Sequence, residues 1–283
     1  MKNQQRSVVP MNSRDQDEIT NGPHDDASLR GSRLQADYLE TEKRLQTAGV
    51  QNTIVVFGGT RIVDEPEAKR REKDARNYSK ENPDDAIGLR DLRIARSLSA
   101  KSRYYSIARE FGKIVGKAGA GPRDCSLTLV TGGGPGIMEA ANRGSHEVGA
   151  KTIGLNITLP NEQHANPYLT PDLSFMLRYF AIRKLHFLLR ARALVIFPGG
   201  YGTLDELFET LNLVATRTIS PLPVILVGES YWRQLVNFDM LVDEGVIDPQ
   251  DRELFWFAES AKEVWNDICE WHRRAGISLH CNH

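Results

Sequence analysis

Short runs of apolar, largely β-branched residues, most of them followed by glycines or turn residues and then by a helical pattern, recur along this 283-residue chain. Runs without polar alternation are typical of parallel strands that are covered on both faces. We therefore expect strands at 53–57, 127–131, 152–157, 193–197 and 223–227. This alternation constrains the fold more than any other feature of the sequence.

Helical periodicity fills the intervals between these runs. We expect helices at 29–45, 102–118, 135–148, 175–191, 202–216, 230–244 and 261–274. Strands that alternate with helices are joined by right-handed crossovers, which produce a parallel sheet with helices on both faces. The predicted fold is therefore α/β, a single-domain, Rossmann-like doubly wound sheet in three αβα layers with an N-terminal extension.

Composition divides the chain into a few regions. Residues 1–27 are polar and nearly free of aromatic side chains, which predicts a disordered tail. The next segment, 28–50, is expected to be an N-terminal helix that packs on the body or on a second subunit. The catalytic domain is expected at 51–275, with a charged, solvated helical insertion at 64–99. The polar end at 276–283 is expected to fray.

Charge and cysteine content exclude several classes of protein. The 36 Lys and Arg residues nearly balance the 37 Asp and Glu residues, so neither nucleic acid nor a membrane surface is an expected partner. The sequence contains no apolar run of about 18 residues, so no membrane span is predicted. Cys125, Cys269 and Cys281 are too few and too far apart for a disulfide framework or a metal knuckle. A cytoplasmic location fits best, and no metal site is expected.

The first notable strand-to-helix turn carries Gly132, Gly133 and Gly134. Consecutive glycines let backbone N–H groups approach an anion at a helix N-terminus, so these three are expected to bind substrate. A dinucleotide site is disfavoured, because Glu139 replaces the third glycine and the next strand ends in Asn156 rather than an acid. The sequence also lacks the P-loop pattern.

A second such turn runs from Pro198 to Glu206 with the sequence PGGYGTLDE. Its glycines suit a phosphate, to which Thr203 adds a hydroxyl group. Asp205 and Glu206 stand close to this anion cradle, which suggests a ligand with a phosphate at one end and hydroxyl groups or a developing cation at the other. Arg183 and Lys184 lie upstream on the helix expected at 175–191. Arg190 and Arg192, farther along, are expected at the surface or in subunit contacts.

The second turn matches P-G-G-x-G-T-x-x-E, the motif of the LONELY GUY (LOG) family of phosphoribohydrolases, which are often mislabelled lysine decarboxylases. Three further blocks resemble the longer bacterial branch of that family in the same order: TGGGPGIMEAANRG at 131–144, GLNITLPNEQHANPY at 154–168 and YFAIRK at 179–184. The resemblance covers roughly residues 50–270.

The resemblance implies hydrolysis of the N-glycosidic bond of a nucleoside 5′-monophosphate, AMP or a cytokinin-type nucleotide, without a cofactor. It implies that Arg183 and Glu206 are catalytic and that Glu162 and Lys184 contact substrate. The family forms homodimers or larger assemblies, so self-association is expected. The complete set of expected substrate-binding residues is Gly132, Gly133, Gly134, Glu162, Lys184, Gly199, Gly200, Tyr201, Gly202, Thr203 and Asp205.

Departures from the plant pattern bear on specificity. Phe180 and Ala181 stand where plant members usually have Met-His, Asp205 replaces a Glu, and Asn212 replaces a Thr. AMP is therefore the expected substrate. Two alternatives remain open: a carrier that binds a nucleotide or a molybdopterin-type cofactor without hydrolysis, and a lysine decarboxylase, which would need pyridoxal phosphate on a lysine.

Overall fold

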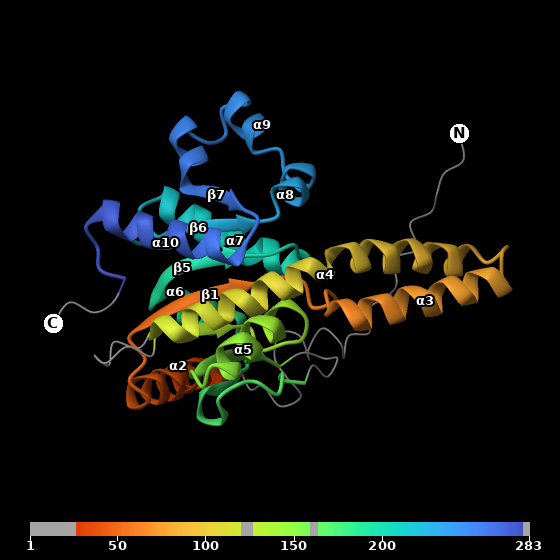
Figure 1. The fold of residues 1–283 in the computed structure, drawn as a ribbon. Coiled ribbons are helices and arrows are strands. Elements are labelled where there is room, and N and C mark those ends of the chain that lie inside the picture. Colours follow the sequence, from red (N-terminus) through yellow and green to blue (C-terminus); the bar gives the residue numbers. More distant parts are fainter. Residues whose placement is uncertain (1–26, 120–126, 159–163, 280–283) are drawn as a thin grey trace.

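The computed structural model describes residues 27–119, 127–158 and 164–279. Within these residues, seven parallel strands form one sheet in the order β4-β3-β2-β1-β5-β6-β7 (Figure 1). Because the strand order reverses around the central β1, the sheet is doubly wound, as the sequence predicts. The strands are β1 (Asn52–Phe57), β2 (Leu127–Thr131), β3 (Thr152–Ile157), β4 (Ser174–Leu177), β5 (Ala191–Ile196), β6 (Val224–Val227) and β7 (Phe255–Ala258).

Helices cover both faces of this sheet and complete the three layers. Side chains of α4, α5 and α10 belong to one hydrophobic cluster, and those of α2, α6, α7, α8 and α9 belong to the other. The helices are α2 (Arg30–Thr47), α3 (Glu65–Glu81), α4 (Ala86–Gly119), α5 (Ile137–Glu147), α6 (Phe180–Leu188), α7 (Tyr201–Ala215), α8 (Glu229–Leu235), α9 (Phe238–Asp243) and α10 (Ala261–Ala275). Short 3₁₀ turns are η1 (Ala27–Leu29), η2 (Pro171–Leu173) and η3 (Pro249–Leu254).

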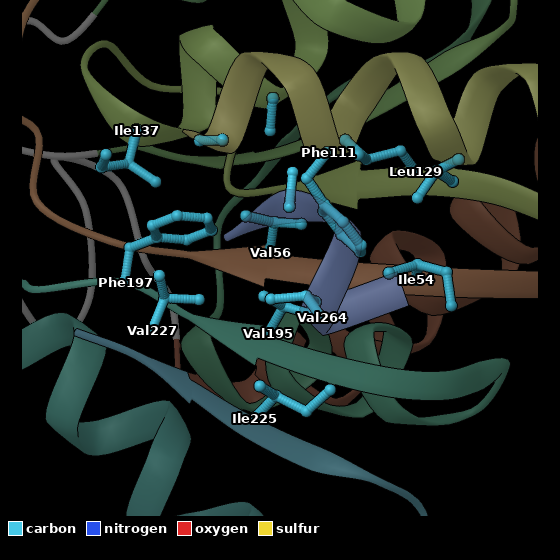
Figure 2. Packing of buried hydrophobic residues seen from close by; sticks show 14 of the residues in the cluster. Ile54, Val56, Phe111, Leu129, Ile137, Val195, Phe197, Ile225, Val227 and Val264 are labelled. Carbon is cyan, nitrogen blue, oxygen red and sulfur yellow. The ribbon is translucent and has the colours of Figure 1, made fainter. Parts of the chain in front are cut away.

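Successive residues of the central strands point alternately into the two clusters. In β1, Ile54 and Val56 join the cluster drawn in Figure 2, whereas Val55 and Phe57 join the opposite one. Phe111 of α4 and Val264 of α10 meet the first set across the sheet face. Both faces of β1 are thus covered by apolar side chains, which explains why its sequence shows no polar alternation.

The region expected as one helix at 175–191 is instead a strand, a helix and the start of another strand. Phe175 and Leu177 are buried whereas Met176 between them is 58% exposed, a two-residue period that fits the edge strand β4. Helix α6 begins only at Phe180, so Arg178 and Tyr179 precede it. The sequence interpretation was wrong here because a four-residue strand abuts a helix that continues the apolar pattern.

Three smaller corrections concern element boundaries. The helix expected at 230–244 is divided into α8 and α9, because Asn237 interrupts it and accepts a hydrogen bond from the backbone N–H of Met240 as an N-cap. Strand β7 was not expected. Helix α5 begins at Ile137, after Gly136 with φ of 74°, so Pro135 lies before the helix rather than in its first turn.

Helix α2 packs on α6 and the η2–β4 segment. Arg44 donates hydrogen bonds to the carbonyl oxygens of Asp172 and Ser174. Arg190, expected at the surface or in subunit contacts, instead forms a largely buried ion pair with Glu42, with 2.9 Å between Nη1 and Oε2. Arg192 likewise bonds within the chain, through Nε to Asn52 Oδ1. Helix α2 is therefore part of the packed body.

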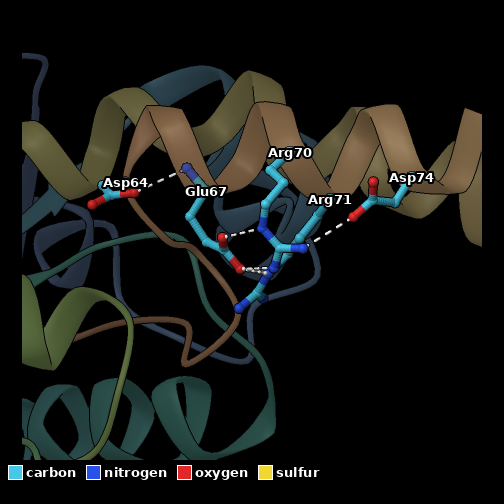
Figure 3. A network of polar contacts seen from close by, with 5 residues as sticks. All are labelled: Asp64, Glu67, Arg70, Arg71 and Asp74. Carbon is cyan, nitrogen blue, oxygen red and sulfur yellow. Dashed lines mark hydrogen bonds and ion pairs between the residues drawn. The ribbon is translucent and has the colours of Figure 1, made fainter.

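The charged segment expected at 64–99 forms α3 and the first part of the 34-residue α4. These two helices lie side by side and extend away from the sheet (Figure 1). Asp64 caps α3 by accepting a hydrogen bond from the backbone N–H of Glu67 at 3.1 Å (Figure 3). Hydrogen bonds from Arg70 and then Arg71 lower the pKa of Glu67 to about 2. Asp64 therefore marks the residue at which the first helix of the hairpin begins.

Replacing this cap tests how the hairpin is anchored. Asp64→Ala leaves backbone N–H groups of the first turn of α3 without an acceptor, which should cost about 1 kcal/mol of helix stability. Amide hydrogen exchange should accelerate in α3, and most at its N-terminal turn. Asp74→Asn, which affects only an exposed ion pair with Arg70, should have a smaller effect; equal acceleration in both variants would contradict the capping role.

Candidate active site

A pocket of 370 Å³ opens at the carboxyl ends of the strands. Its walls come from the turn after β1, the turn after β2, the end of β3, and the N-terminal parts of α5, α6 and α7. The pocket lies where the strand order reverses between β1 and β5. Ligands of open parallel sheets bind at this position, because helix N-termini from both directions converge there.

Backbone contacts between three turns build the floor of the pocket. Gly59 donates its N–H to the carbonyl oxygen of Pro198 at 2.8 Å, and Ile137 donates to the carbonyl oxygen of Gly59 at 3.2 Å. Gly136 has φ of 74°, and a Cβ there would collide with the backbone of Gly59 and Thr60. Only a glycine permits so close an approach with this backbone conformation.

The turn after β1 also belongs to the site, although the sequence did not lead us to expect it there. Gly58, Gly59 and Thr60 all line the pocket. The sequence signal was the Gly-Gly pair directly after an apolar run, which was used only as evidence for a strand end. Because β1 is central in the sheet, its following turn necessarily adjoins the switch point.

The N-terminus of α7 supplies a second wall. Gly200, Tyr201, Gly202 and Thr203 line the pocket, and Gly200 at the N-cap position offers no side chain to the first-turn N–H groups. Such a helix end attracts an anion through its free N–H groups and its dipole. Gly199 does not line the pocket; its carbonyl oxygen accepts a hydrogen bond from the Tyr231 hydroxyl at 2.6 Å.

The triple-glycine turn after β2 is mostly occupied by internal contacts. Gly133 donates its N–H to Thr131 Oγ1, and the Asn166 amide donates to the carbonyl oxygens of Gly133 and Gly134. Of the three glycines, Gly132 is the one that lines the pocket. This turn therefore contributes fewer groups to an anion-binding site than the sequence suggested. Gly133 and Gly134 take part in the hydrogen bonds that hold the turn in its conformation.

Arg183 from α6 and Glu206 from α7 meet at the pocket, with 3.4 Å between Nη2 and Oε1. Only 4% of Glu206 is exposed. Burial raises the pKa of Glu206 to about 7, although the positive charges of Arg183 and Lys184 oppose the shift. Burial lowers the pKa of Arg183, whose guanidinium group lies 4.6 Å from the centre of the Phe180 ring.

Two other residues expected to bind substrate, Lys184 and Asp205, lie outside the pocket lining. Lys184 pairs with Asp205 at 2.9 Å and with Glu209 at 3.1 Å, and neither Lys184 nor Asp205 lines the pocket. Although partial burial opposes the shift, these two carboxylates raise the pKa of Lys184. Glu162 lies outside the described residues.

Among residues 27–119, 127–158 and 164–279, no group of three or more His, Cys, Asp or Glu side chains is arranged to hold a metal ion. In the same residues, none of the helices combines the length and the apolar character that a membrane span requires.

The chain is 31% identical over 195 residues to cytokinin riboside 5′-monophosphate phosphoribohydrolase LOG3 of Arabidopsis thaliana, covering 65% of this chain and 84% of the relative. The chain belongs to the LOG family. A second relative, the probable cytokinin riboside 5′-monophosphate phosphoribohydrolase LOG4 of Oryza sativa subsp. japonica, is 33% identical over 149 residues. These residues are 51% of this chain and 63% of that relative. A family profile described as "Possible lysine decarboxylase" matches residues 138–268.

Two solved structures are similar to this LOG-family chain. The X-ray structure of TM1055, a structural genomics target, gives a TM-score of 0.46 at 21% identity and covers 77% of this chain and 99% of its own. The Moco carrier protein from Chlamydomonas reinhardtii gives a TM-score of 0.47 at 18% identity and covers 79% of this chain and 99% of its own.

The burial of Glu206 predicts an unusual titration. Glu206 should titrate near pH 7 in the free protein, so that its carboxylate forms only as the pH rises through neutrality. Arg183→Met removes the largest opposing charge and should move this midpoint higher. The measurement is ¹³C NMR of labelled glutamate carboxyl groups, with Glu206→Gln assigning the signal. A midpoint near 4.5 in the wild type would show that burial does not control this carboxyl group.

Proposed function

We propose that this LOG-family protein hydrolyses the N-glycosidic bond of nucleoside 5′-monophosphates, with AMP as the preferred substrate and a free base and ribose 5-phosphate as products. The Arabidopsis relative is a cytokinin riboside 5′-monophosphate phosphoribohydrolase, and the rice relative is a probable one. The observation that carries the proposal is the buried Glu206, which faces a pocket beside Arg183 and one helical turn from the N-terminus of α7.

The phosphate of the substrate is assigned to the N-terminus of α7. Gly200, Tyr201 and Gly202 offer backbone N–H groups there, and Thr203 offers its hydroxyl group. A phosphate held at this position contributes binding energy away from the reacting bond, which can be used to position the sugar. This assignment predicts a preference for nucleotides over nucleosides.

Glu206 is assigned to the ribose. Cleavage of the C1′–N bond leaves its electron pair on the base and positive charge on the sugar, and water then forms the new C1′–O bond. A carboxylate beside the ring stabilises that charge or orients the water. Because the pKa of Glu206 is about 7, an appreciable fraction of the protein carries the carboxylate at neutral pH. For Arg183 the proposal leaves three alternative roles: it keeps Glu206 charged, it contacts the phosphate, or it contacts the base.

The pocket does not favour lysine decarboxylation. A pyridoxal phosphate enzyme needs a lysine amine that can become neutral and attack an aldehyde. The described residues that line the pocket include no lysine. Lys184, the nearest candidate in the sequence, is held by Asp205 and Glu209, which favour its charged form. The name of the family profile is thus a poor guide to this pocket.

Catalysis is tested by mixing the purified protein with AMP and measuring adenine and ribose 5-phosphate. Glu206→Gln should lower kcat/KM by about 100-fold or more, because it removes the negative charge while preserving shape. Glu244→Gln, a change at an exposed glutamate outside the pocket, is the matched control. Tight AMP binding without adenine release in the wild type would favour the carrier alternative, and full activity of Glu206→Gln would remove this residue from the mechanism.

We further propose that the protein forms a homodimer or larger assembly through α6. Leu185 of this helix and Leu189, its C-cap residue one turn farther on, are 44% and 48% exposed. Leu189→Asp should dissociate the assembly in analytical ultracentrifugation, whereas Val246→Asp, at another exposed apolar residue, should not. A wild type that is monomeric at micromolar concentration would contradict the proposal.

A further inference from the structure

Asn156 at the end of β3 is a buried polar residue to which the mechanism gives no role. It lines the pocket and is only 4% exposed. Its side-chain nitrogen, Nδ2, has no hydrogen-bond partner among the residues that the structure describes. Buried amide groups are almost always hydrogen-bonded in folded proteins, and leaving one unpaired is costly. An acceptor from a bound ligand would satisfy it.

The surrounding packing holds this amide in place. Leu155 and Ile157 point into the hydrophobic cluster on the face of the sheet that α2, α6 and α7 cover. Because side chains alternate along a strand, Asn156 between them points to the other face, toward α5. There it lies against Gly133, where an added Cβ would come within 2.5 Å of both Nδ2 and Oδ1. The positive φ of Gly133 and the absence of its side chain therefore make room for the amide.

The sheet order indicates which part of a nucleotide reaches Asn156. Between β3 and β5 lie β2 and β1, so the ends of β3 and β5 are separated by three strand spacings, roughly 14 Å. The proposed phosphate and sugar positions, at the N-terminus of α7 and at Glu206, both lie on the β5 side. The base, at the other end of the nucleotide, therefore points toward β3.

The neighbours of Asn156 in the pocket suit a flat aromatic ring. Met138, Ile157 and Phe180 line the same pocket and present mainly apolar surface. Within this lining, the amide of Asn156 supplies a donor and an acceptor side by side. A carboxamide of this kind pairs with the N7 acceptor and the 6-amino donor of adenine, whereas a 6-oxopurine offers two acceptors at the same edge.

We propose that Asn156 recognises the base, with Nδ2 donating to a ring nitrogen and Oδ1 accepting from the 6-amino group, so that the pocket selects 6-aminopurine nucleotides. This inference rests on the proposed function and specifies its substrate class. The donated hydrogen bond also stabilises the electron pair that remains on the base when the C1′–N bond breaks. Asn156 is thus a specificity residue that acts on the leaving group.

Comparison of AMP with IMP tests the proposal. The wild type should prefer AMP in kcat/KM by about 10-fold or more, within the range of a bidentate amide–base contact. Asn156→Leu should bring the AMP/IMP ratio close to 1, mainly by loss of activity on AMP. Asn156→Asp, which keeps the shape but removes the donor, should also lose activity on AMP. Asn77→Leu, at an exposed position of α3, is the matched control.

Inhibition by ribose 5-phosphate separates base recognition from sugar or phosphate binding. Its inhibition constant should change less than about twofold in both Asn156 variants, because this product lacks a base; thermal unfolding of the variants is compared to verify that they fold. Weakened inhibition by ribose 5-phosphate, or an unchanged AMP/IMP ratio, overturns the proposal.

Failure of the proposed function can be distinguished from failure of this inference by a binding measurement. If the wild type releases no base from any nucleotide, calorimetric titration with AMP and IMP still measures the selectivity of the pocket. Tighter binding of AMP that is lost in Asn156→Leu supports base recognition without catalysis. Equal binding of the two nucleotides to the wild type overturns the assignment of Asn156.

Discussion

Close backbone contact between the turns after β1, β2 and β5 is the constraint on which the site depends. The carbonyl oxygen of Gly59 accepts from Ile137, and the N–H of Gly59 donates to Pro198. These contacts place the starts of α5 and α7 on either side of one turn. The glycines here permit the approach of main chains that side chains would hold apart. The pocket is a consequence of that packing.

Two oppositely charged side chains are then buried at the point where these turns meet. Arg183 and Glu206 are both largely removed from water, so each depends on the other to offset the cost of burial. The resulting contact is imperfect at 3.4 Å, and burial still shifts the pKa of Glu206 to about 7. Perturbed carboxyl groups of this kind are typical of functional sites. The neighbouring pair of Lys184 and Asp205 is more exposed and joins α6 to α7.

The sequence predicted the parts of this structure that depend on local pattern. Strands β2 and β3 were predicted residue for residue, because their apolar runs are bounded by clear turn signals. The four-residue β4 was mistaken for helix, since Phe175 and Leu177 also fit the apolar spacing of the helix that follows. Arg190 was misplaced because its partner, Glu42, is 148 positions away. Pairing over such distances leaves no local trace.

The candidate site was predicted in a similarly uneven way. The motif from Pro198 to Glu206 placed the start of α7 at the pocket, and the resemblance to the LOG family added Arg183. Gly133 and Gly134 were expected to bind substrate through their N–H groups, but the N–H of Gly133 donates to Thr131 Oγ1 and neither glycine lines the pocket, which no glycine pattern reveals. The contribution of Gly58–Thr60 required knowledge of the strand order.

The wide separation of these wall segments along the chain has a consequence for biosynthesis. Strand β5 pairs with β1, and 191 − 57 = 134 positions separate the end of β1 from the start of β5. Formation of such a distant pairing requires closure of a long loop, which slows folding. A ribosome-bound chain that has not yet exposed α7 contains neither the helix end nor Glu206. The proposed site therefore cannot be complete until synthesis has passed Glu206, which follows the start of α7 at Tyr201.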